Sequence, residues 1–279
     1  VMKGWKWYLN HYGRDPKCRR NARNGTEEGV QLHVDATPSY MMMPFCSQRM
    51  KKVIPEALKS RVRFIAVLRE PVARDLSWFN HQGAINKFFS RHHKKGTTYE
   101  QYAGNSLKIA KKFEGFQDAP IHLIRQAFYA EQIEAWVKEW GHETLMVVNY
   151  QTLVQNTSDT LQRMQRFLNL PPAAKFPPPK LPASNERPFE GKRHLADIDP
   201  QICVGLREAW REQNERLYQI LADPSRNFAG GLQPPFPPFP DPCDVTSAST
   251  RRRDNATQVA PARPPKVTAL KSRIVSVKR

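Results

Sequence analysis

The sequence predicts an α/β protein in which a parallel β-sheet is flanked by helices. Two apolar runs, RFIAVLR at 63–69 and TLMVVN at 144–149, have the composition of strands that are buried on both faces. Helical patterns follow each run along the chain. Strands that alternate with helices in this way are typical of a parallel sheet with helices on both of its faces.

The first half of the chain contains further predicted elements. Apolar and polar residues alternate over 29–40, which predicts a short strand that runs into a turn at Thr37-Pro38. Pro71 suits the first turn of a helix that we expect to reach about Asn86. One helical face over 133–140 is apolar, and Gly141 is expected to end that helix. Its residues are Ile133, Trp136, Val137 and Trp140.

Two more helices are expected in the second half. Thr157, Ser158 and Asp159 are residue types that favour a helix start, and Asp199 followed by Pro200 opens the last clear helix. The expected inward residues are Leu161, Met164 and Leu168 in the first of these helices, and Ile202, Leu206, Trp210, Leu217 and Leu221 in the second.

The composition changes at about Gly230. From there the chain is rich in proline and then in arginine, serine and threonine, which is typical of disordered segments. We therefore expect a folded domain over residues 1–229 and a disordered tail over 230–279.

The charge indicates an anionic partner. Lysine and arginine number 44 against 26 aspartates and glutamates, a net charge of +18. Residues 244–279 contribute nine basic and two acidic residues of that excess, and the candidate domain carries the rest. Such a balance favours nucleic acid, acidic polysaccharide, anionic lipid or nucleotide phosphates. The sequence contains neither an apolar run long enough for a transmembrane helix nor an apolar signal-peptide core near Val1.

The cysteine spacing does not resemble a zinc or redox motif. Cys18, Cys46, Cys203 and Cys243 are far apart in the sequence, and one or two disulfides are compatible with it. Three glycosylation sequons, which begin at 24, 156 and 255, favour the lumen of the secretory pathway.

The segment LREPVARDLSW, residues 68–78, carries the most specific chemistry. The predicted strand delivers Arg69 at its carboxyl end, the helix begins at Pro71, and Ser77 follows two turns later. Ligands of open α/β sheets bind at the carboxyl ends of strands. A guanidinium fork beside a serine hydroxyl suits a terminal phosphate. The alternative is a surface Arg–Glu pair and a helix serine without a ligand.

These residues resemble the sulfotransferases that use 3′-phosphoadenosine 5′-phosphosulfate (PAPS), and among them the Golgi heparan sulfate group of N- and 3-O-sulfotransferases. The 3′-phosphate motif of that family is Arg-Asp-Pro-x-x-Arg-x-x-Ser, and this chain has REPVARDLS at 69–77. The following SWFNHQ at 77–82 is similar to the Ser-Trp-Tyr-x-His-Gln of the N-sulfotransferase domain.

The resemblance covers roughly residues 3–222 in the family's order. Supporting segments are GWKWY at 4–8, DATPSY at 35–40, NYQTL at 149–153, GKR at 191–193 and the helix at 206–221. Three family features lack a counterpart. They are the Lys-x-Gly-(Thr/Ser) loop for the 5′-phosphosulfate, the glutamate base, and a lysine at the position of Ala36. We therefore expect a P-loop-NTPase-like sheet without its first strand and phosphate loop, a start internal to a longer protein, and little sulfate transfer by residues 1–279.

The resemblance implies in-line transfer of a sulfuryl group from PAPS to a hydroxyl or amine of a glycan, without a metal. It assigns cofactor binding to Arg69, Ser77, Lys192 and Arg193, and substrate contact to Trp78, Gln82 and Asp35. His81 is the candidate for acid–base chemistry, one turn beyond Ser77. The alternative for His81 is a hydrogen bond at the rim of the cleft.

The implied partners are the nucleotide and a sulfated or acidic polysaccharide, in the Golgi lumen. A membrane is expected only through an N-terminal anchor of a longer, type II protein. A second hypothesis is a catalytically inactive, sulfotransferase-like protein that binds polyanions. A nucleic-acid binder is disfavoured, because no recognition-helix, zinc-finger or RRM pattern is present. Binding of adenosine 3′,5′-bisphosphate separates the sulfotransferase from the other two.

Overall fold

A computed structural model of the protein describes residues 34–43, 45–85, 96–110, 123–171 and 193–244. The strands are β1 (Phe64–Leu68) and β2 (Leu145–Asn149). The α-helices are α3 (Cys46–Val53), α4 (Glu56–Lys59), α5 (Pro71–Ile85), α7 (Tyr99–Ala110), α8 (Tyr129–Trp140), α9 (Tyr150–Gln155), α10 (Thr157–Phe167) and α11 (Pro200–Ala222). Short 3₁₀ turns are η1 (Leu123–Ala127), η2 (His142–Thr144), η3 (Leu195–Asp197), η4 (Pro224–Arg226) and η5 (Phe228–Gly231).

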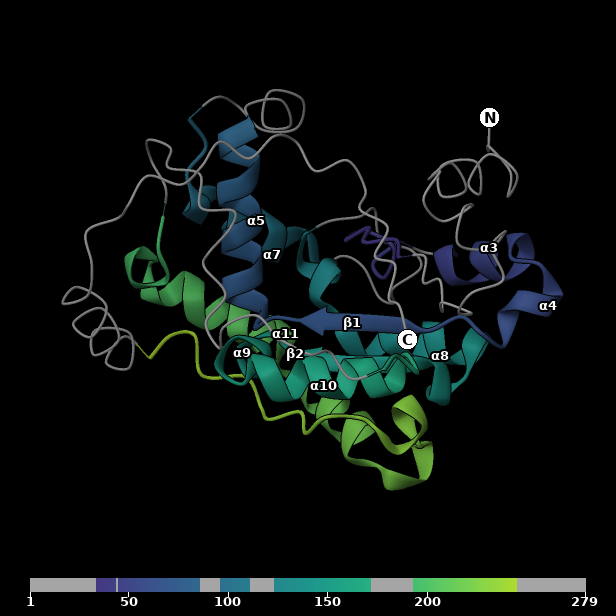
Figure 1. The fold of residues 1–279 in the computed structure, drawn as a ribbon. Coiled ribbons are helices and arrows are strands. Elements are labelled where there is room, and N and C mark those ends of the chain that lie inside the picture. The colour runs from purple at the N-terminus through teal and green to yellow at the C-terminus, as the bar shows by residue number, and fades with distance from the viewer. Residues whose placement is uncertain (1–33, 44, 86–95, 111–122, 172–192, 245–279) are drawn as a thin grey trace, which may run out of the picture.

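The two strands pair in parallel, as the apolar runs predict. The register sets Phe64 beside Leu145 and Leu68 beside Asn149, so both strands end at the same edge. Each strand is followed directly by a helix, α5 after β1 and α9 after β2 (Figure 1). The predicted parallel sheet is therefore confirmed, and its carboxyl edge lies where both helices begin.

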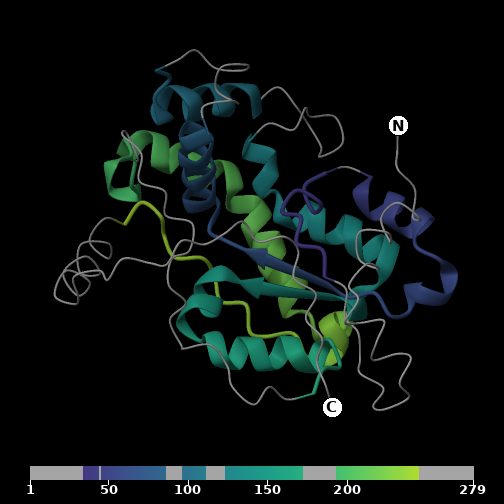
Figure 2. The ribbon, with the colours of Figure 1, turned by 45° about the horizontal axis from the view of Figure 1, so that its top comes forward.

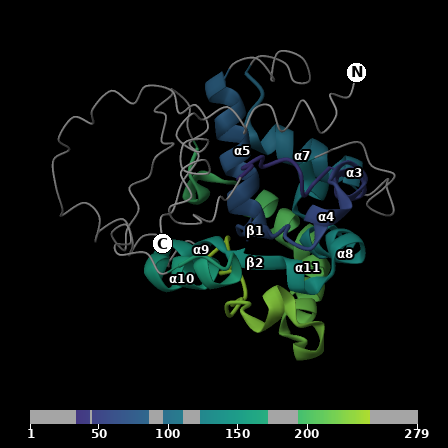
Figure 3. The same ribbon diagram turned by 45° about the vertical axis from the view of Figure 1, so that its right-hand side comes forward.

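Helices cover both faces of this pair of strands. Leu145 and Val147 face one cluster, which contains residues of α5, α8 and α11. Met146 and Val148 face the other, with Phe167 of α10 and Ala229 of η5. Figure 3 shows α10 and α8 on different sides of the strands. The expectation that 63–69 is buried on both faces is confirmed only at Leu68, because residues 64–66 are half-buried and Val67 is 45% exposed.

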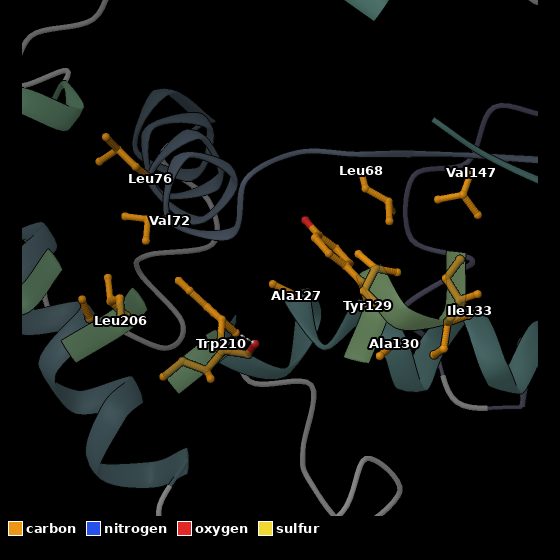
Figure 4. Packing of buried hydrophobic residues seen from close by; sticks show 14 of the residues in the cluster. Leu68, Val72, Leu76, Ala127, Tyr129, Ala130, Ile133, Val147, Leu206 and Trp210 are labelled. Atoms are coloured by element: carbon orange, nitrogen blue, oxygen red, sulfur yellow. Dashed lines mark hydrogen bonds between the residues drawn. The ribbon is translucent and has the colours of Figure 1, made fainter. Parts of the chain in front are cut away.

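The larger cluster joins the start of α5 to α8 and α11. Leu68 lies near Tyr129 of α8, whereas Val72 lies on the side of Leu206 and Trp210 of α11 (Figure 4). The Trp210 indole N–H donates a hydrogen bond of 2.7 Å to the carbonyl of Ile124, so this large side chain is buried without losing its polar contact. The core therefore supports the strand-to-helix turn on which the candidate site lies.

The predicted end of α8 and start of α11 are confirmed, whereas two other predictions differ from the structure. Gly141 ends α8 at a φ of 84°, and the Asp199 carboxylate caps α11 by accepting from Gln201 and Ile202 N–H. In α10 the fully buried residues are Thr157, Thr160 and Phe167, whereas the predicted inward Leu161 is only half-buried. The predicted strand over 29–40 is wrong for residues 34–36, which have no strand structure, and residues 29–33 lie outside the described ranges.

The proline-rich segment that follows η5 is ordered, so the prediction of disorder from Gly230 is wrong for residues 230–244. We call residues 232–243 the strap. Phe236, Phe239 and Cys243 of the strap pack on the main core, and Cys243 forms a disulfide with Cys203 of α11. Proline lacks an N–H and cannot extend a sheet ladder, so the strap is held through side chains. Residues 245–279 lie outside the described ranges.

The strap follows β2 towards its carboxyl end (Figure 2). The Val147 N–H donates to the Gln233 side chain at 2.9 Å, and the Gln233 amide donates back to the Val147 carbonyl. Two residues further along β2, the Asn149 amide donates to the Pro237 carbonyl at 3.1 Å. The two Gln233 bonds satisfy the backbone N–H and carbonyl of Val147, and the Asn149 bond attaches the strap through a side chain.

Candidate functional site

Arg69 and Tyr150 lie side by side at the carboxyl edge of the sheet. Leu68 and Asn149 are paired and end the two strands. Arg69 and Tyr150 are the residues that directly follow them. The Arg69 guanidinium carbon lies 5.3 Å from the centre of the Tyr150 ring, a cation–π contact. The Tyr129 hydroxyl donates a 2.9 Å hydrogen bond to the Arg69 carbonyl. Both contacts fix Arg69 at the place predicted for a phosphate site.

The guanidinium of Arg69 keeps its hydrogen-bonding capacity. In the ranges that the structure describes, none of its N–H groups donates a hydrogen bond, although the residue is only half-buried. An arginine fork fixed by its backbone and by an aromatic face can accept a phosphate in a bidentate manner. This arrangement favours the phosphate-site interpretation over the surface Arg–Glu pair.

The Glu70 carboxylate lies at the N-terminus of α5, where the free N–H groups of a helix usually bind an anion. Its two carboxylate oxygens accept from Val72 N–H at 3.0 Å and Ala73 N–H at 2.6 Å. The first amides of α5 are therefore already bonded, and an anionic ligand at this edge has to use side chains instead. Burial raises the pKa of Glu70 to about 7, although the Ala73 and Val72 N–H groups and the charge of Arg69 oppose that shift.

The raised pKa of Glu70 predicts a pH-dependent stability. An acid whose pKa is higher in the folded state stabilises the fold most below its unfolded pKa, about 4.5, and that contribution is lost as pH rises through about 7. Relative to Glu70→Gln, the wild-type free energy of unfolding should therefore fall by about 2 kcal/mol between pH 5 and pH 7. Denaturant titrations of both proteins at several pH values measure this difference. Parallel curves would contradict the assignment.

Ser77 and His81 follow one another along α5. Both side chains are exposed, and a spacing of four residues puts them on the same face of the helix, one turn apart. Trp78 is half-buried, and its ring centre lies 5.9 Å from that of His81. Its indole N–H is shielded from solvent and has no hydrogen-bond partner among the described residues. The side chain of Gln82 lies outside the described residues.

Arg193 reaches α5 from a segment that is distant in the sequence. Its backbone N–H donates to the Asn80 side chain at 3.1 Å, and the Asn80 amide donates to the Arg193 carbonyl at 2.8 Å. The Arg193 guanidinium forms an ion pair with Glu100 and donates to the Asp197 carbonyl at 2.7 Å. Asn80 lies three residues beyond Ser77, so Arg193 lies at the same helix. Lys192 lies outside the described ranges.

Removal of the Asn80 side chain should loosen Arg193. We expect Asn80→Ala to weaken adenosine 3′,5′-bisphosphate binding about fivefold, the scale of one neutral hydrogen bond, because Arg193 then loses its attachment to α5. Asn105→Ala is the matched control, since Asn105 is exposed on the neighbouring α7. Calorimetry on the two variants checks this prediction. Equal affinities would show that the position of Arg193 does not matter for the nucleotide.

Two residues of the quoted motifs have a structural role here. Asp35 accepts hydrogen bonds from the Thr37 hydroxyl at 2.7 Å and the Tyr40 hydroxyl at 2.8 Å, which closes the predicted turn. Arg74 donates to the Gln126 side chain from inside the protein. Both side chains therefore shape local structure, and the role of Asp35 in substrate contact stays a prediction.

The interior face of α5 also holds a buried carboxylate. Asp75 accepts from the Tyr99 hydroxyl at 3.1 Å and is 2% exposed. Burial raises the pKa of Asp75 to about 6, and the nearby Arg74 charge limits that rise. These contacts fix α5 on the core, so its outer face with Ser77 and His81 is held in place.

A cavity of about 380 Å³ lies between α11 and the strap. Glu70 is part of its wall, together with Tyr218, Asn214 and Phe239, but Arg69, Ser77 and His81 are not. The predicted site residues therefore lie outside this cavity. The described residues contain no group of three His, Cys, Asp or Glu side chains that could hold a metal ion.

Sequence reasoning missed Tyr150, Tyr129 and Asn80 as supports of the site. Tyr150 could have been found, because it follows the second predicted strand at the position that Arg69 has after the first. Tyr129 and Asn80 have no such signal, since the residues that they contact are 60 and 113 positions away in the sequence.

Comparison with known proteins places these residues in a family context. The family described as "Sulfotransferase domain" matches residues 31–178, which is more than half of the chain. Heparan sulfate glucosamine 3-O-sulfotransferase 5 of Homo sapiens is 22% identical over 211 residues, which are 68% of this chain and 55% of that protein. Bifunctional heparan sulfate N-deacetylase/N-sulfotransferase 2 of Homo sapiens is 24% identical over 190 residues, 61% of this chain and 20% of that protein.

Among solved structures, a sulfotransferase from Alicyclobacillus acidocaldarius matches 79% of this chain and 77% of its own, at 15% identity and a TM-score of 0.45. The chain spans about half of the length of the 3-O-sulfotransferases that it matches.

Proposed function

The chain belongs to the sulfotransferase domain family, and from this we propose that it takes part in the transfer of a sulfuryl group from PAPS to a hydroxyl or amine of an acidic glycan. The observation that carries the proposal is Arg69. It stands at the carboxyl end of β1, fixed by Tyr129 and Tyr150, with N–H donors that no described residue occupies.

The residues at this edge fit the 3′-phosphate of the nucleotide. Glu70 already bonds the first amides of α5, so the phosphate is held by side chains, namely the Arg69 fork and the exposed Ser77 hydroxyl. Arg193 is attached to Asn80 of α5 and adds a positive charge near Ser77. Its guanidinium also forms the ion pair with Glu100, so the phosphate would share Arg193 with that carboxylate. Lys192 is assigned to the same group by its neighbouring position in the sequence.

His81 is proposed as the acid–base residue. It is exposed on the helix face that carries Ser77, one turn further from the sheet, and its ring lies against Trp78. A neutral imidazole at this position can take the proton of an acceptor hydroxyl or amine. When bound, PAPS supplies the sulfuryl group and an anionic leaving group, and the protein contributes position and positive charge. Trp78, Gln82 and Asp35 are proposed to contact the acceptor.

A location in the secretory pathway fits two described features. The Cys203–Cys243 disulfide is typical of oxidising compartments, and Asn156 of the second sequon is exposed in the turn between α9 and α10. None of the described helices has the length and apolar character that crossing a bilayer requires. The names of the two human relatives further favour heparan sulfate as the acceptor class.

The test is transfer of radiolabelled sulfate from PAPS to desulfated heparan sulfate by a longer protein that contains residues 1–279, because residues 1–279 alone are expected to transfer little sulfate. The proposal predicts incorporation that falls strongly in Arg69→Ala and in His81→Ala, with nucleotide binding weakened only in the former. Retention on heparin without nucleotide binding would support the polyanion-binding hypothesis instead. Incorporation that is insensitive to Arg69 would contradict the assigned site.

A further inference from the structure

The strap is linked to Arg69 through intermediate residues, although it lies far from Arg69 in the sequence. Its Phe239 ring contacts Tyr129 of α8, which bonds the Arg69 carbonyl. Its Pro237 carbonyl accepts from Asn149, the neighbour of Tyr150, whose ring faces the Arg69 guanidinium. We propose that the strap is a positioning element of the nucleotide site, which fixes Arg69 for the phosphate. This inference rests on the proposed function, because it assumes that Arg69 binds the nucleotide.

The first connection runs through Tyr129. The Phe239 ring of the strap lies 6.2 Å from the Tyr129 ring, centre to centre, and the Tyr129 hydroxyl donates to the Arg69 carbonyl. In Figure 4, Tyr129 projects from α8 towards the chain that joins β1 to α5. Phe239 is itself fixed, because its N–H donates to the Tyr218 hydroxyl at 2.9 Å. The Phe239 ring therefore restricts the orientation of the Tyr129 ring, and with it the position of the Tyr129 hydroxyl.

The second connection runs through Asn149. Its side-chain amide donates to the Pro237 carbonyl of the strap, while its side-chain oxygen accepts from Gln151 and Thr152 N–H. One side chain thus ties the strap to the start of α9. The first residue of α9 is Tyr150, whose ring faces the Arg69 guanidinium. The backbone and the guanidinium of Arg69 are therefore both linked to the strap.

The strap is anchored at both of its ends. Gln233 bonds both backbone groups of Val147 near its beginning. Near its end, Asp241 pairs with Arg207 at 2.8 Å and Cys243 forms the disulfide with Cys203. Six of its twelve residues are proline, so the segment between these anchors has little freedom. A segment that is held and stiff in this way can transmit its position to Tyr129 and Asn149.

The expected consequence concerns affinity for the nucleotide. An arginine that is already held pays less conformational entropy when it binds a phosphate, and this preorganisation raises affinity without a new contact. Loss of the strap contact to Tyr129 should weaken nucleotide binding about fivefold, the scale of one hydrogen bond or one aromatic pair. In a longer protein that contains residues 1–279, turnover at saturating nucleotide should change less than the KM for the nucleotide.

Two variants probe the first connection, and a third is the control. Phe239→Ala removes the ring that touches Tyr129, and Tyr129→Phe removes the hydroxyl but keeps the packed ring. Leu107→Ala is the control, because Leu107 is a half-buried apolar residue of α7 that packs on the main core outside the strap, beside Gly205 of α11. Each variant is made in the wild-type and in the Arg69→Ala background.

Calorimetric titration with adenosine 3′,5′-bisphosphate is the readout, and thermal unfolding reports the fold. We expect Phe239→Ala and Tyr129→Phe each to weaken binding about fivefold and Leu107→Ala to stay within about twofold. In the Arg69→Ala background neither of the first two should weaken binding further, because residues that act through one another are not additive.

The outcomes separate the two proposals. A wild-type chain that does not bind the nucleotide, or an Arg69→Ala variant that binds as well as wild type, would contradict the proposed function and the inference with it. If Arg69→Ala weakens binding while Phe239→Ala and Tyr129→Phe do not, only the role of the strap is overturned. The same holds if their effects persist in full without Arg69. If Phe239→Ala lowers the unfolding midpoint, the role of the strap is judged from Tyr129→Phe in the wild-type and Arg69→Ala backgrounds, since that variant keeps the packed ring.

Discussion

Arg69→Ala should weaken binding of adenosine 3′,5′-bisphosphate by about 1.5–3 kcal/mol, or roughly 10- to 150-fold. The guanidinium stands at the carboxyl edge of the sheet and has no other hydrogen bond in the described ranges, so a phosphate there would take its full donor capacity. The carbonyl of residue 69 stays available to Tyr129 in the alanine variant, because that bond involves only the backbone of residue 69. The measurement is calorimetric titration at fixed ionic strength.

The control for this change is Arg61→Ala. Arg61 is exposed on the amino side of β1, so its removal alters the net charge equally but leaves the carboxyl edge intact. We expect Arg61→Ala to change the affinity less than twofold, which is the scale of a distant, screened charge. Equal losses in the two variants would mean that only net charge matters, and Arg69 would no longer be assigned to the phosphate.

Loss of the Cys203–Cys243 disulfide should lower the free energy of unfolding by about 4 kcal/mol. The two cysteines are 40 residues apart, and closing a loop of that length removes about this much conformational entropy from the unfolded chain. The variant is Cys243→Ser, because Cys203 is only 3% exposed and its substitution would also disturb the core. Denaturant unfolding without reductant measures the change.

Cys46→Ser is the matched control for the disulfide. Cys46 is a half-buried free thiol of α3, and its replacement by serine should change stability by less than about 1 kcal/mol. Reductant should lower the stability of the wild-type protein towards that of Cys243→Ser and leave Cys243→Ser itself unchanged. A wild-type protein that is equally stable with and without reductant would contradict the bond.

The sheet and its main helices could be predicted because their signals are local. β1 and β2 are short apolar runs, and α8 and α11 repeat their apolar residues at helical spacing between capping residues. The strap could not be predicted in this way. Its proline content resembles that of disordered segments, and what orders it is a cysteine and two phenylalanines that find partners far away in the sequence.

The site also combines residues with a local sequence signal and residues that only long-range contacts bring together. Arg69 and Ser77 belong to one strand-to-helix motif, so nine residues of sequence are enough to propose them together. Their supports come from α8, from β2 and from the strap, and these contacts depend on how the helices pack. Asp35 is proposed from its place in a motif, and the structure adds two hydrogen bonds by which it closes a turn, while its contact with the substrate stays a prediction.

The most direct test of the account compares two ligands that differ by one phosphate. The dissociation constants of adenosine 3′,5′-bisphosphate and adenosine 5′-phosphate are measured for wild type and for Arg69→Ala. If Arg69 and Ser77 hold the 3′-phosphate, wild type binds the bisphosphate at least about tenfold more tightly, and most of this preference disappears in Arg69→Ala. A preference that is equally large in both proteins, or absent from wild type, would contradict the assignment of this edge to the 3′-phosphate.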